Sequence, residues 1–278
     1  MLSPRGLRNL KNEFRNSHLA KLGLLLVIAV VLVAVFAPLV APHDPTAQQL
    51  EGSKLPPVGF SKTTNETTSR MVNGSIRTVT DRTTIEADLT HPLGTDGLGR
   101  DMLSRVIYGA RTSLLVGVLG TLFAVLLGVP VGLIAGFYGG SVDDTLMRIA
   151  DISLAFPSLV LAIALIGLWG RVTVPVPDPF VAAGLAPGMP AAATLPVTVV
   201  VVVGLVNWVW FARVARGEAL SLRKEAYVKA ARALGASNGR IVRRHVLPNA
   251  VTPIIVLGTV QIAAIILLES SLSFLGFS

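Results

Sequence analysis

The chain has 278 residues, of which 52% are hydrophobic and 14% are charged. A soluble domain usually carries about 25% charged residues, so this composition indicates a membrane protein. The formal net charge is +8, cysteine is absent, and the four histidines are far apart in the sequence. These facts exclude a disulfide framework and a thiolate metal site, and they argue against a heme or zinc role.

Five uncharged runs can each supply the roughly 20 apolar residues that cross a hydrocarbon core about 30 Å thick. Backbone polar groups in lipid must be satisfied within each segment, so we predict an all-α polytopic membrane protein. The five expected spans are residues 22–42, 112–142, 152–170, the second half of 179–212, and 246–268.

Basic residues gather at two places, and this predicts the orientation of the chain. One group precedes the first span, and nine Lys or Arg lie between Arg213 and Arg244, with only Glu218 and Glu225 among them. Both groups should face the cytoplasm, so we expect a cytoplasmic N-terminus in a multi-pass protein of the cell membrane. The positive charge is therefore explained by the positive-inside rule beside membrane lipid, which disfavours a nucleic-acid partner.

The N-terminal third divides into three predicted parts. Residues 1–21 form a cytoplasmic segment, residues 22–42 the first span, and residues 43–110 an external loop. The uncharged core of the first span exceeds the 7–15 residues of a signal h-region, which favours an uncleaved anchor.

A polar, Thr-rich insert covers Ser61–Thr90 of the external loop. Its alternating pattern is compatible with a β-hairpin that turns at Asn73–Gly74, and a mobile loop explains it about equally well. Two N-x-S/T sequences begin at Asn65 and Asn73 and could accept glycans on the exposed side.

The segment His91–Arg105 reads HPLGTDGLGRDMLSR. Its glycines do not make a phosphate loop, because the Gly-Lys-Ser/Thr ending is absent and no strand pattern precedes them. We predict a tight turn, with Asp101 near the cap of the next helix.

The second span contains small residues at every fourth position, which favours close helix packing in lipid over a substrate path. The predicted packing ridge is Gly120, Ala124, Gly128, Gly132, Gly136 and Gly140.

The following segments carry several local expectations. Asp151 is expected to be solvated or paired with Arg148 at the membrane edge, and Pro157 should kink the third span. Trp208 suits an interfacial anchor near the inner end of the fourth span. Residues 172–193 are expected to form an external linker or a re-entrant segment.

A basic segment, KEAYVKAARALGASNGRIVRRHVLP, follows the fourth span at Lys224–Pro248. Tyr227, Ala230, Ala231 and Leu234 recur at helical spacing and predict one apolar stripe. Gly235 can take the positive φ that ends a helix, and Ser237 can cap the next helix.

A second apolar face covers Ile241, Val242, His245 and Val246 until Pro248 interrupts it. Two short helices at an angle are therefore expected within a cytoplasmic loop at 213–248. An amphipathic helix lying on anionic lipid would show the same periodicity.

This segment resembles the EAA loop of ABC-importer permeases, whose pattern is EAA, three residues, Gly, nine residues, then I-x-L-P. Aligned on Gly235, the chain reads Lys229-Ala230-Ala231 before the glycine and His245-Val246-Leu247-Pro248 after it. Lys229 replaces the family's Glu, a role that Glu225 could take, and His245 replaces the nominal Ile. The segment at His91 resembles the one before the second span of dipeptide, oligopeptide and nickel permeases.

The resemblance implies a type I importer bundle and a loop that docks on an ATPase. The residues implied in coupling are Tyr227, Lys229, Ala230, Ala231, Leu234, Gly235, Ala236, His245, Leu247 and Pro248. It also implies a homologous permease as heterodimer partner, two ATP-binding cassette subunits, and an extracytoplasmic solute-binding protein. Substrate-binding residues are not identifiable from the sequence.

No G-x-x-x-x-G-K-[ST] occurs, so this chain is expected to be a transport subunit without catalytic residues or metal ligands. ATP and Mg²⁺ would then be bound by the partner subunits. An ion-gradient-driven transporter is the alternative, but it would need ionisable residues in mid-span, and the five runs contain none.

The fifth span is expected to end at Glu269, where the carboxyl group meets substrate or faces water. The peptide-permease branch continues past the Leu-Ser-Phe-Leu-Gly-Phe sequence into a sixth span, so the resemblance implies that this span is missing from the chain.

Overall fold

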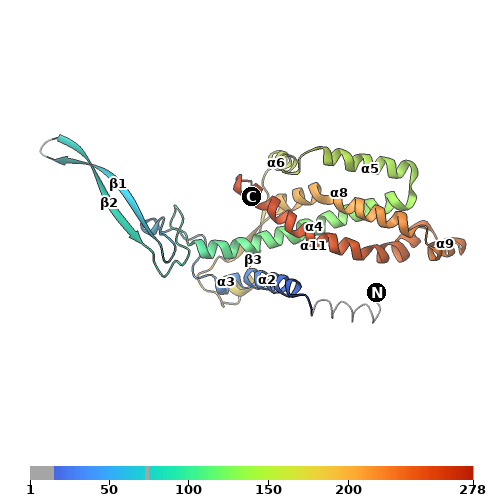
Figure 1. Cartoon of the computed structure of the whole chain (residues 1–278), viewed down its shortest axis with the longest axis horizontal. Coiled ribbons are helices and arrows are strands. Elements are labelled where there is room, and N and C mark those ends of the chain that lie inside the picture. Colours follow the sequence, from blue (N-terminus) through green and yellow to red (C-terminus); the bar gives the residue numbers. More distant parts are fainter. Residues whose placement is uncertain (1–15, 73–74, 278) are drawn as a thin grey trace. The chain divides into compact units, whose positions relative to one another are not determined.

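The computed structural model describes residues 16–72 and 75–277. Contacts divide the chain into two compact units, one of residues 1–111 and 177–193, the other of residues 112–176 and 194–278. Four helices of the described residues are long and apolar enough to cross a membrane, and they overlap the first, second, fourth and fifth predicted runs (Figure 1). The third run overlaps a bent pair of helices, Gly140–Ala155 and Ser158–Trp169, which counts as a fifth span if the pair crosses as one unit.

The first unit begins with helix α2 (His18–Val35) and the short helix α3 (Ala37–Val40). The Ser17 hydroxyl caps α2 by accepting a hydrogen bond from the Ala20 amide at 3.2 Å. Only 6% of the most apolar window of α2 is buried, which leaves nearly the whole helix for lipid or another chain. A 3-10 turn, η1, follows at Leu50–Gly52.

The Thr-rich insert forms the hairpin of β1 (Ser61–Val72) and β2 (Ser75–Glu86), which confirms one of the two expectations for it. The strands pair antiparallel from Ser61 opposite Glu86 to Val72 opposite Ser75 (Figure 1). The expected turn and glycan acceptor at Asn73–Gly74 lie outside the described residues. Such long β-branched, polar strands fit a pleated ladder in water and could not span lipid alone.

The turn before the second span is held by side-chain caps, as predicted. Asp101 precedes α4 (Met102–Tyr138), and its Oδ2 accepts a hydrogen bond from the Ser104 amide at 2.7 Å. The Asp96 carboxylate forms ion pairs with the guanidinium groups of Arg100, at 2.7 Å, and of Arg105. These bonds satisfy donors at the start of the helix and close the loop.

The Pro- and Ala-rich segment 172–193 contains strand β3 (Thr173–Pro177), the short helix α7 (Pro179–Ala182), and the start of β4 (Ala192–Pro196). Asp178 caps α7, with its Oδ1 accepting from the Phe180 amide at 2.9 Å. The same carboxylate forms an ion pair with Arg111 in the first unit. Burial would raise the pKa of Asp178, but the Arg111 guanidinium and the helix amides hold it below its usual value.

The second unit contains most of α4 together with α5 (Gly140–Ala155), α6 (Ser158–Trp169), α8 (Val197–Leu222) and α11 (Leu247–Phe274). Helices α5 and α6 are bent by 92° at the break that contains Pro157. The predicted kink is therefore confirmed, because proline cannot supply the amide that would continue the helix.

The small-residue positions of α4 lie against the backbone of α8. A Cβ added at Gly128 would lie 2.2 Å from the Trp208 carbonyl oxygen, and one at Gly132 would lie 2.1 Å from the Ala212 carbonyl oxygen. A Cβ added at Gly136 would lie 2.4 Å from the Arg216 carbonyl oxygen. Because nothing larger than hydrogen fits, the two helix backbones approach each other closely.

The two ends of the predicted ridge behave differently. Gly120 meets the Val203 side chain at 2.6 Å and Ala124 is fully buried. Gly140 departs from the expectation: it begins α5 with φ of +58°, and no atom lies within 4 Å of its Cβ position. The helix has already ended at Tyr138, so the four-residue spacing no longer places Gly140 on the packed face.

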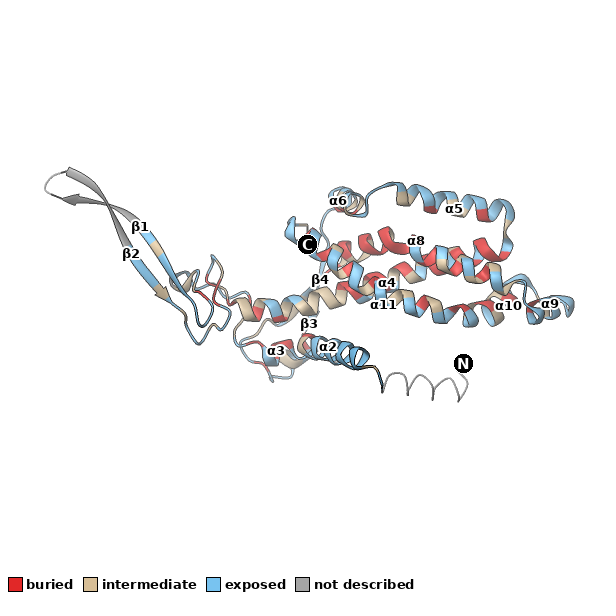
Figure 2. Cartoon of the chain, viewed as in Figure 1, coloured by how far each residue is buried: buried red, intermediate tan, exposed pale blue. Residues whose placement is uncertain are grey.

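Asp151 is solvated, which is one of the two expectations for it: its side chain is 64% exposed. It pairs with Arg213 of α8 at 2.7 Å and not with Arg148. The expectation that Trp208 is an interfacial anchor is wrong: it is 9% exposed and packs with Ala150 and Ala212, so it is a core residue. Buried residues recur along α8, as the red segments of that helix in Figure 2 show.

Of the two alternatives for Glu269, exposure to water is wrong, and contact with substrate stays a prediction. The residue is 5% exposed, and its carboxylate accepts a hydrogen bond from the Ser113 hydroxyl at 2.9 Å. The last helix continues past this residue to Phe274, which keeps Glu269 within the bundle.

Candidate functional site

The loop after α8 folds into a helical corner, which we define as residues 224–248. Helix α9 (Ala226–Ala233) ends at Leu234, and Gly235 has φ of +81° as predicted. The Gly235 amide donates to the Arg232 carbonyl and the Ala236 amide to the Ala231 carbonyl, each at 3.0 Å. This is a Schellman ending, and it reverses the chain at an exposed glycine.

The second arm of the corner starts at α10 (Asn238–Ile241) and continues through the π-helical turn η2 (Val242–Val246) into α11. Ser237 stands at the N-cap of α10, but its side chain makes no capping hydrogen bond, so that part of the prediction is wrong. Ser237 therefore has the backbone conformation of an N-cap residue, but its hydroxyl does not stabilise the start of α10.

Pro248 does not interrupt the second arm, contrary to expectation. Residues 238–274 form one helical run of 37 residues, and the proline lies in the first turn of α11. A proline ring clashes with the carbonyl four residues earlier in a regular α-helix. The wider π turn at Val242–Val246 moves that carbonyl aside and lets the helix continue.

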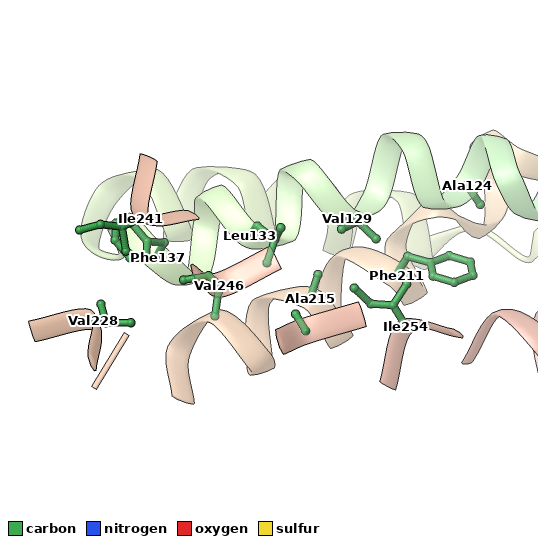
Figure 3. Close-up of a cluster of buried hydrophobic side chains, with 12 residues drawn as sticks. Ala124, Val129, Leu133, Phe137, Phe211, Ala215, Val228, Ile241, Val246 and Ile254 are labelled. Carbon is green, nitrogen blue, oxygen red and sulfur yellow. The ribbon is translucent and has the colours of Figure 1, made fainter. Parts of the chain in front are cut away.

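The buried side of the corner is not the predicted stripe. Val228, Ile241 and Val246 are fully buried, and they join Phe137 of α4 and Ala219 of α8 in one apolar cluster (Figure 3). Leu234, by contrast, is 88% exposed. Periodicity found an apolar face on α9 but did not tell which side packs inward.

Two arginines fasten the corner to the end of α4. The Arg223 guanidinium donates to the Gly136 carbonyl at 3.1 Å, at the carbonyl-rich end of the helix. The Arg232 guanidinium lies 5.6 Å from the centre of the Phe137 ring. This spacing is within the range of a cation–π contact. Arg223, directly before the corner, and Arg232 within it thus attach the corner to α4, while Leu234 at the tip is exposed.

The residues of the predicted coupling set fall into two groups. Tyr227, Lys229, Ala230, Leu234, Gly235 and Pro248 are exposed, whereas Ala231, Ala236, His245 and Leu247 are half-buried. The rings of Tyr227 and His245 lie 6.2 Å apart and bring the two arms together. Burial, and to a lesser degree the Glu225 carboxylate, raise the pKa of Tyr227, so its hydroxyl is neutral at physiological pH.

Two hollows border the second arm. A basic pocket of ≈ 560 Å³ is lined by Gly239, Arg240, Arg243 and Arg244. An apolar groove of ≈ 550 Å³ lies against α4, and its lining includes Val129, Leu133, Tyr138, Val242 and Leu247. The corner therefore offers a cationic surface beside an apolar one, which suits a protein partner with acidic and apolar groups.

Sequence reasoning missed an ion pair that joins α5 to α8. The Arg216 guanidinium donates to both carboxylate oxygens of Asp143, at 2.5 and 2.7 Å. Asp143 keeps 11% of its side chain exposed, and the bidentate geometry is the strong form of such a pair. A pairing across 73 residues leaves no local signal in the sequence.

Polar side chains are also buried within the bundle. Asn207 donates to the Val203 carbonyl of its own helix at 2.8 Å, and Gln261 of α11 contacts Asn207 at 3.4 Å. Thr121 of α4, Thr198 of α8 and Glu269 of α11 are further buried polar residues of the second unit.

Comparison with known proteins identifies the family. Residues 128–278 match the binding-protein-dependent transport system inner membrane component, and residues 9–57 match the N-terminal TM domain of oligopeptide transport permease C. The dipeptide transport system permease protein DppC of Alkalihalophilus pseudofirmus is 33% identical over 95% of this chain and 69% of its own length.

Other relatives are equally similar. The oligopeptide transport system permease protein OppC of Bacillus subtilis is 33% identical over 95% of this chain and 69% of that protein. The di/tripeptide permease DppC of Pseudomonas aeruginosa is 32% identical over 99% and 76%. A solved structure of the inward-facing MetNI methionine ABC transporter overlaps with a TM-score of 0.48 at 18% identity, covering 62% of this chain and 74% of that one.

The helical bundle, the basic corner and these matches together define the class of the protein, a membrane-embedded transport subunit. The chain belongs to the binding-protein-dependent permease family of ABC importers, with DppC- and OppC-like permeases as its relatives. It spans about two thirds of the length of the first two of these relatives, at 69% each.

Proposed function

We propose that this chain forms half of a translocation pathway for peptides or a related small solute, nickel included. Relatives named for dipeptides, oligopeptides and di/tripeptides support the peptide class. In this proposal a homologous permease supplies the other half, and an extracytoplasmic solute-binding protein delivers the substrate.

The helical corner is proposed as the docking element for an ATP-binding cassette subunit, one of two in the assembly. One observation carries this docking proposal. Leu234 at the tip of the corner is 88% exposed, while Val228 and Ile241 at its base are fully buried. An apolar side chain held out by a rigid turn gains free energy only when a partner covers it. ATP and Mg²⁺ would be bound by that partner.

The packing suggests how ATPase movement would reach the membrane. The second arm of the corner is continuous with α11, and its buried residues contact the ends of α4 and α8. A displacement of the tip would therefore shift the ends of three helices together. Closure of the ATPases on ATP could switch access to the pathway in this way, with no covalent chemistry in this chain.

The orientation belongs to the same proposal. The corner must face the cytoplasm to meet an ATPase, which also places the N-terminus inside and the β1–β2 hairpin outside. The positive-inside rule supports this arrangement, because the corner and its flanks carry nine Lys or Arg.

The test is affinity purification of the tagged chain in mild detergent, with wild type compared with Gly235→Trp and Leu234→Asp. Both changes are at the exposed tip, and no atom lies within 4 Å of the Gly235 Cβ position. Gly235→Trp also strains the turn, because Gly235 has φ of +81°, whereas Leu234→Asp leaves the backbone unstrained. We expect wild type to bring down an ATPase and a second permease, and both variants to lose the ATPase alone.

Leu89→Asp is the matched control, because Leu89 is 81% exposed and lies in the external loop. It should retain both partners. Recovery of wild type without an ATPase, or equal ATPase recovery with the tip variants, would contradict the proposed docking role.

A further inference from the structure

Two of the four histidines, His43 and His91, meet in space although 48 positions separate them in the sequence. Their rings stack with centroids 4.6 Å apart and planes inclined by 8°. Asp101, the capping residue of α4, lies beside them. One ligand atom from each of the three residues lies within 4.8 Å of the others. The separation of these two histidines in the sequence is therefore no measure of their distance in the fold.

The three residues come from two stretches of the first unit, the one after α3 and the turn before α4. His43 follows α3, His91 opens the turn before α4, and Asp101 is the last residue before that helix. The His43 amide donates to the Ser104 hydroxyl at 3.0 Å, which draws the first stretch onto the start of α4. The fold thus positions the side chains through backbone contacts that are independent of any ligand.

The protonation of His91 follows from its neighbours. The Thr90 hydroxyl donates to the Asp88 carboxylate at 2.6 Å, so its oxygen is left to accept from the His91 Nδ1 at 2.9 Å. The proton then resides on Nδ1, and Nε2 keeps a free lone pair. Histidines that bind metals commonly have their other ring nitrogen fixed by such a hydrogen bond.

The other two residues carry buried polar atoms with unmet bonding capacity. Neither Nδ1 of His43 nor Oδ1 of Asp101 has a hydrogen-bond partner, and both atoms are buried. Asp101 is 2% exposed, and its second oxygen is already bound by the Ser104 amide. An unsatisfied carboxylate oxygen beside two imidazoles is costly unless a cation compensates it.

We propose that His43, His91 and Asp101 form a binding site for a divalent transition-metal ion, with Zn²⁺ as the best match. Two imidazoles and one carboxylate are a ligand set that zinc accepts, and a water can complete the tetrahedron. Ligand atoms around tetrahedral zinc lie about 3.3 Å apart, so the ion would draw the three side chains slightly together. Bound metal would cross-link the stretch after α3 to the turn that begins α4.

The test is Zn²⁺ binding to the purified full chain in detergent, measured by competition with a chromophoric chelator. Absorption of bound Co²⁺ reports the coordination geometry. Wild type is expected to bind about one ion and to unfold at a higher temperature with Zn²⁺. His43→Gln, His91→Gln and Asp101→Asn should abolish binding and remove the thermal shift. Thr90→Ala should weaken binding about 10–100-fold, since it releases the His91 ring.

His18→Gln and His245→Gln are the controls, because each removes a histidine outside the triad and should bind Zn²⁺ as wild type does. Elution as a single symmetric gel-filtration peak checks that each variant is folded. The proposal is overturned if folded wild type binds no ion, or if the three triad variants bind as well as the two controls. Either result leaves the ATPase-docking proposal untouched, because that role concerns the second unit.

Discussion

At the scale of single residues, close contacts decide what each position tolerates. The glycines of α4 illustrate this, since Gly132 has the Ala212 carbonyl oxygen where its Cβ would be. Gly217 of α8 has nothing within 4 Å of the same position, although it also lies inside a helix. A side chain is therefore excluded at Gly132, whereas Gly217 has room for one.

We predict that Gly132→Ala lowers the free energy of unfolding by about 1–3 kcal/mol, the usual range for overpacking. Gly217→Ala should be neutral or slightly stabilising, because alanine is the better helix former. Thermal unfolding of the purified variants in detergent distinguishes them. Equal unfolding temperatures for the two variants would show that α4 and α8 are not in close contact.

The Asp143–Arg216 pair should be the most sensitive ionic contact between helices of the second unit. Asp143→Asn removes a charge-assisted bidentate bond and should cost about 1.5–3 kcal/mol. Asp144→Asn changes an exposed neighbour and should cost much less. Unfolding temperatures again provide the measurement, and similar losses for both variants would argue against this ion pair.

Asp96 provides a pH-dependent test of the loop before α4. Burial would raise its pKa, but hydrogen bonds and charge from Arg100 lower it from 3.8 to about 2. A lowered folded-state pKa means that the carboxylate stabilises the fold above about pH 4 and loses this effect as the pH falls toward 2. The unfolding temperatures of wild type and Asp96→Asn should therefore differ at neutral pH and converge near pH 2. A difference that persists unchanged at low pH would contradict the assignment.

At the scale of elements, the corner packs on the bundle through one side. Val228, Ile241 and Val246 join this side to α4 and α8 (Figure 3), whereas Leu234 at the tip is 88% exposed. The stability of the corner should depend on the buried side chains and not on the exposed ones.

We expect Ile241→Ala to loosen the corner, since truncation of a buried isoleucine costs about 2–5 kcal/mol. Limited trypsin digestion should then cut after Lys229 or Arg232 several-fold faster than in wild type. Leu234→Ala is the matched control, and its digestion rate should be unchanged because Leu234 is 88% exposed. Faster cutting in the control as well would mean that the tip contributes to the fold.

At the scale of the whole molecule, the absence of cysteine makes the orientation directly measurable. Leu89→Cys should react with a membrane-impermeant maleimide in intact cells, and Leu234→Cys only after permeabilisation. Both positions are more than 80% exposed, at 81% and 88%, so burial does not explain a difference in labelling. The reverse labelling pattern would invert the proposed orientation.

The sequence by itself determined the membrane class, four of the five spans, the kink at Pro157 and the positive φ of Gly235. These features depend on properties that are local along the chain: runs of apolar residues, a missing amide hydrogen and the freedom of glycine. The small-residue spacing on α4 likewise marked a surface for close packing before its partner was known. The family followed from the spacing around Gly235 and was confirmed by comparison.

Only the tertiary structure decided which residues meet. The pairs Asp143–Arg216 and Asp151–Arg213 join different helices, and His43 reaches His91 across the first unit. The tertiary structure also decided that Val228 is buried while Leu234 is exposed. It placed a π turn at Val242–Val246, and the helix continues past Pro248. Such contacts depend on how helices pack against one another, and helical periodicity records a face without recording its partner.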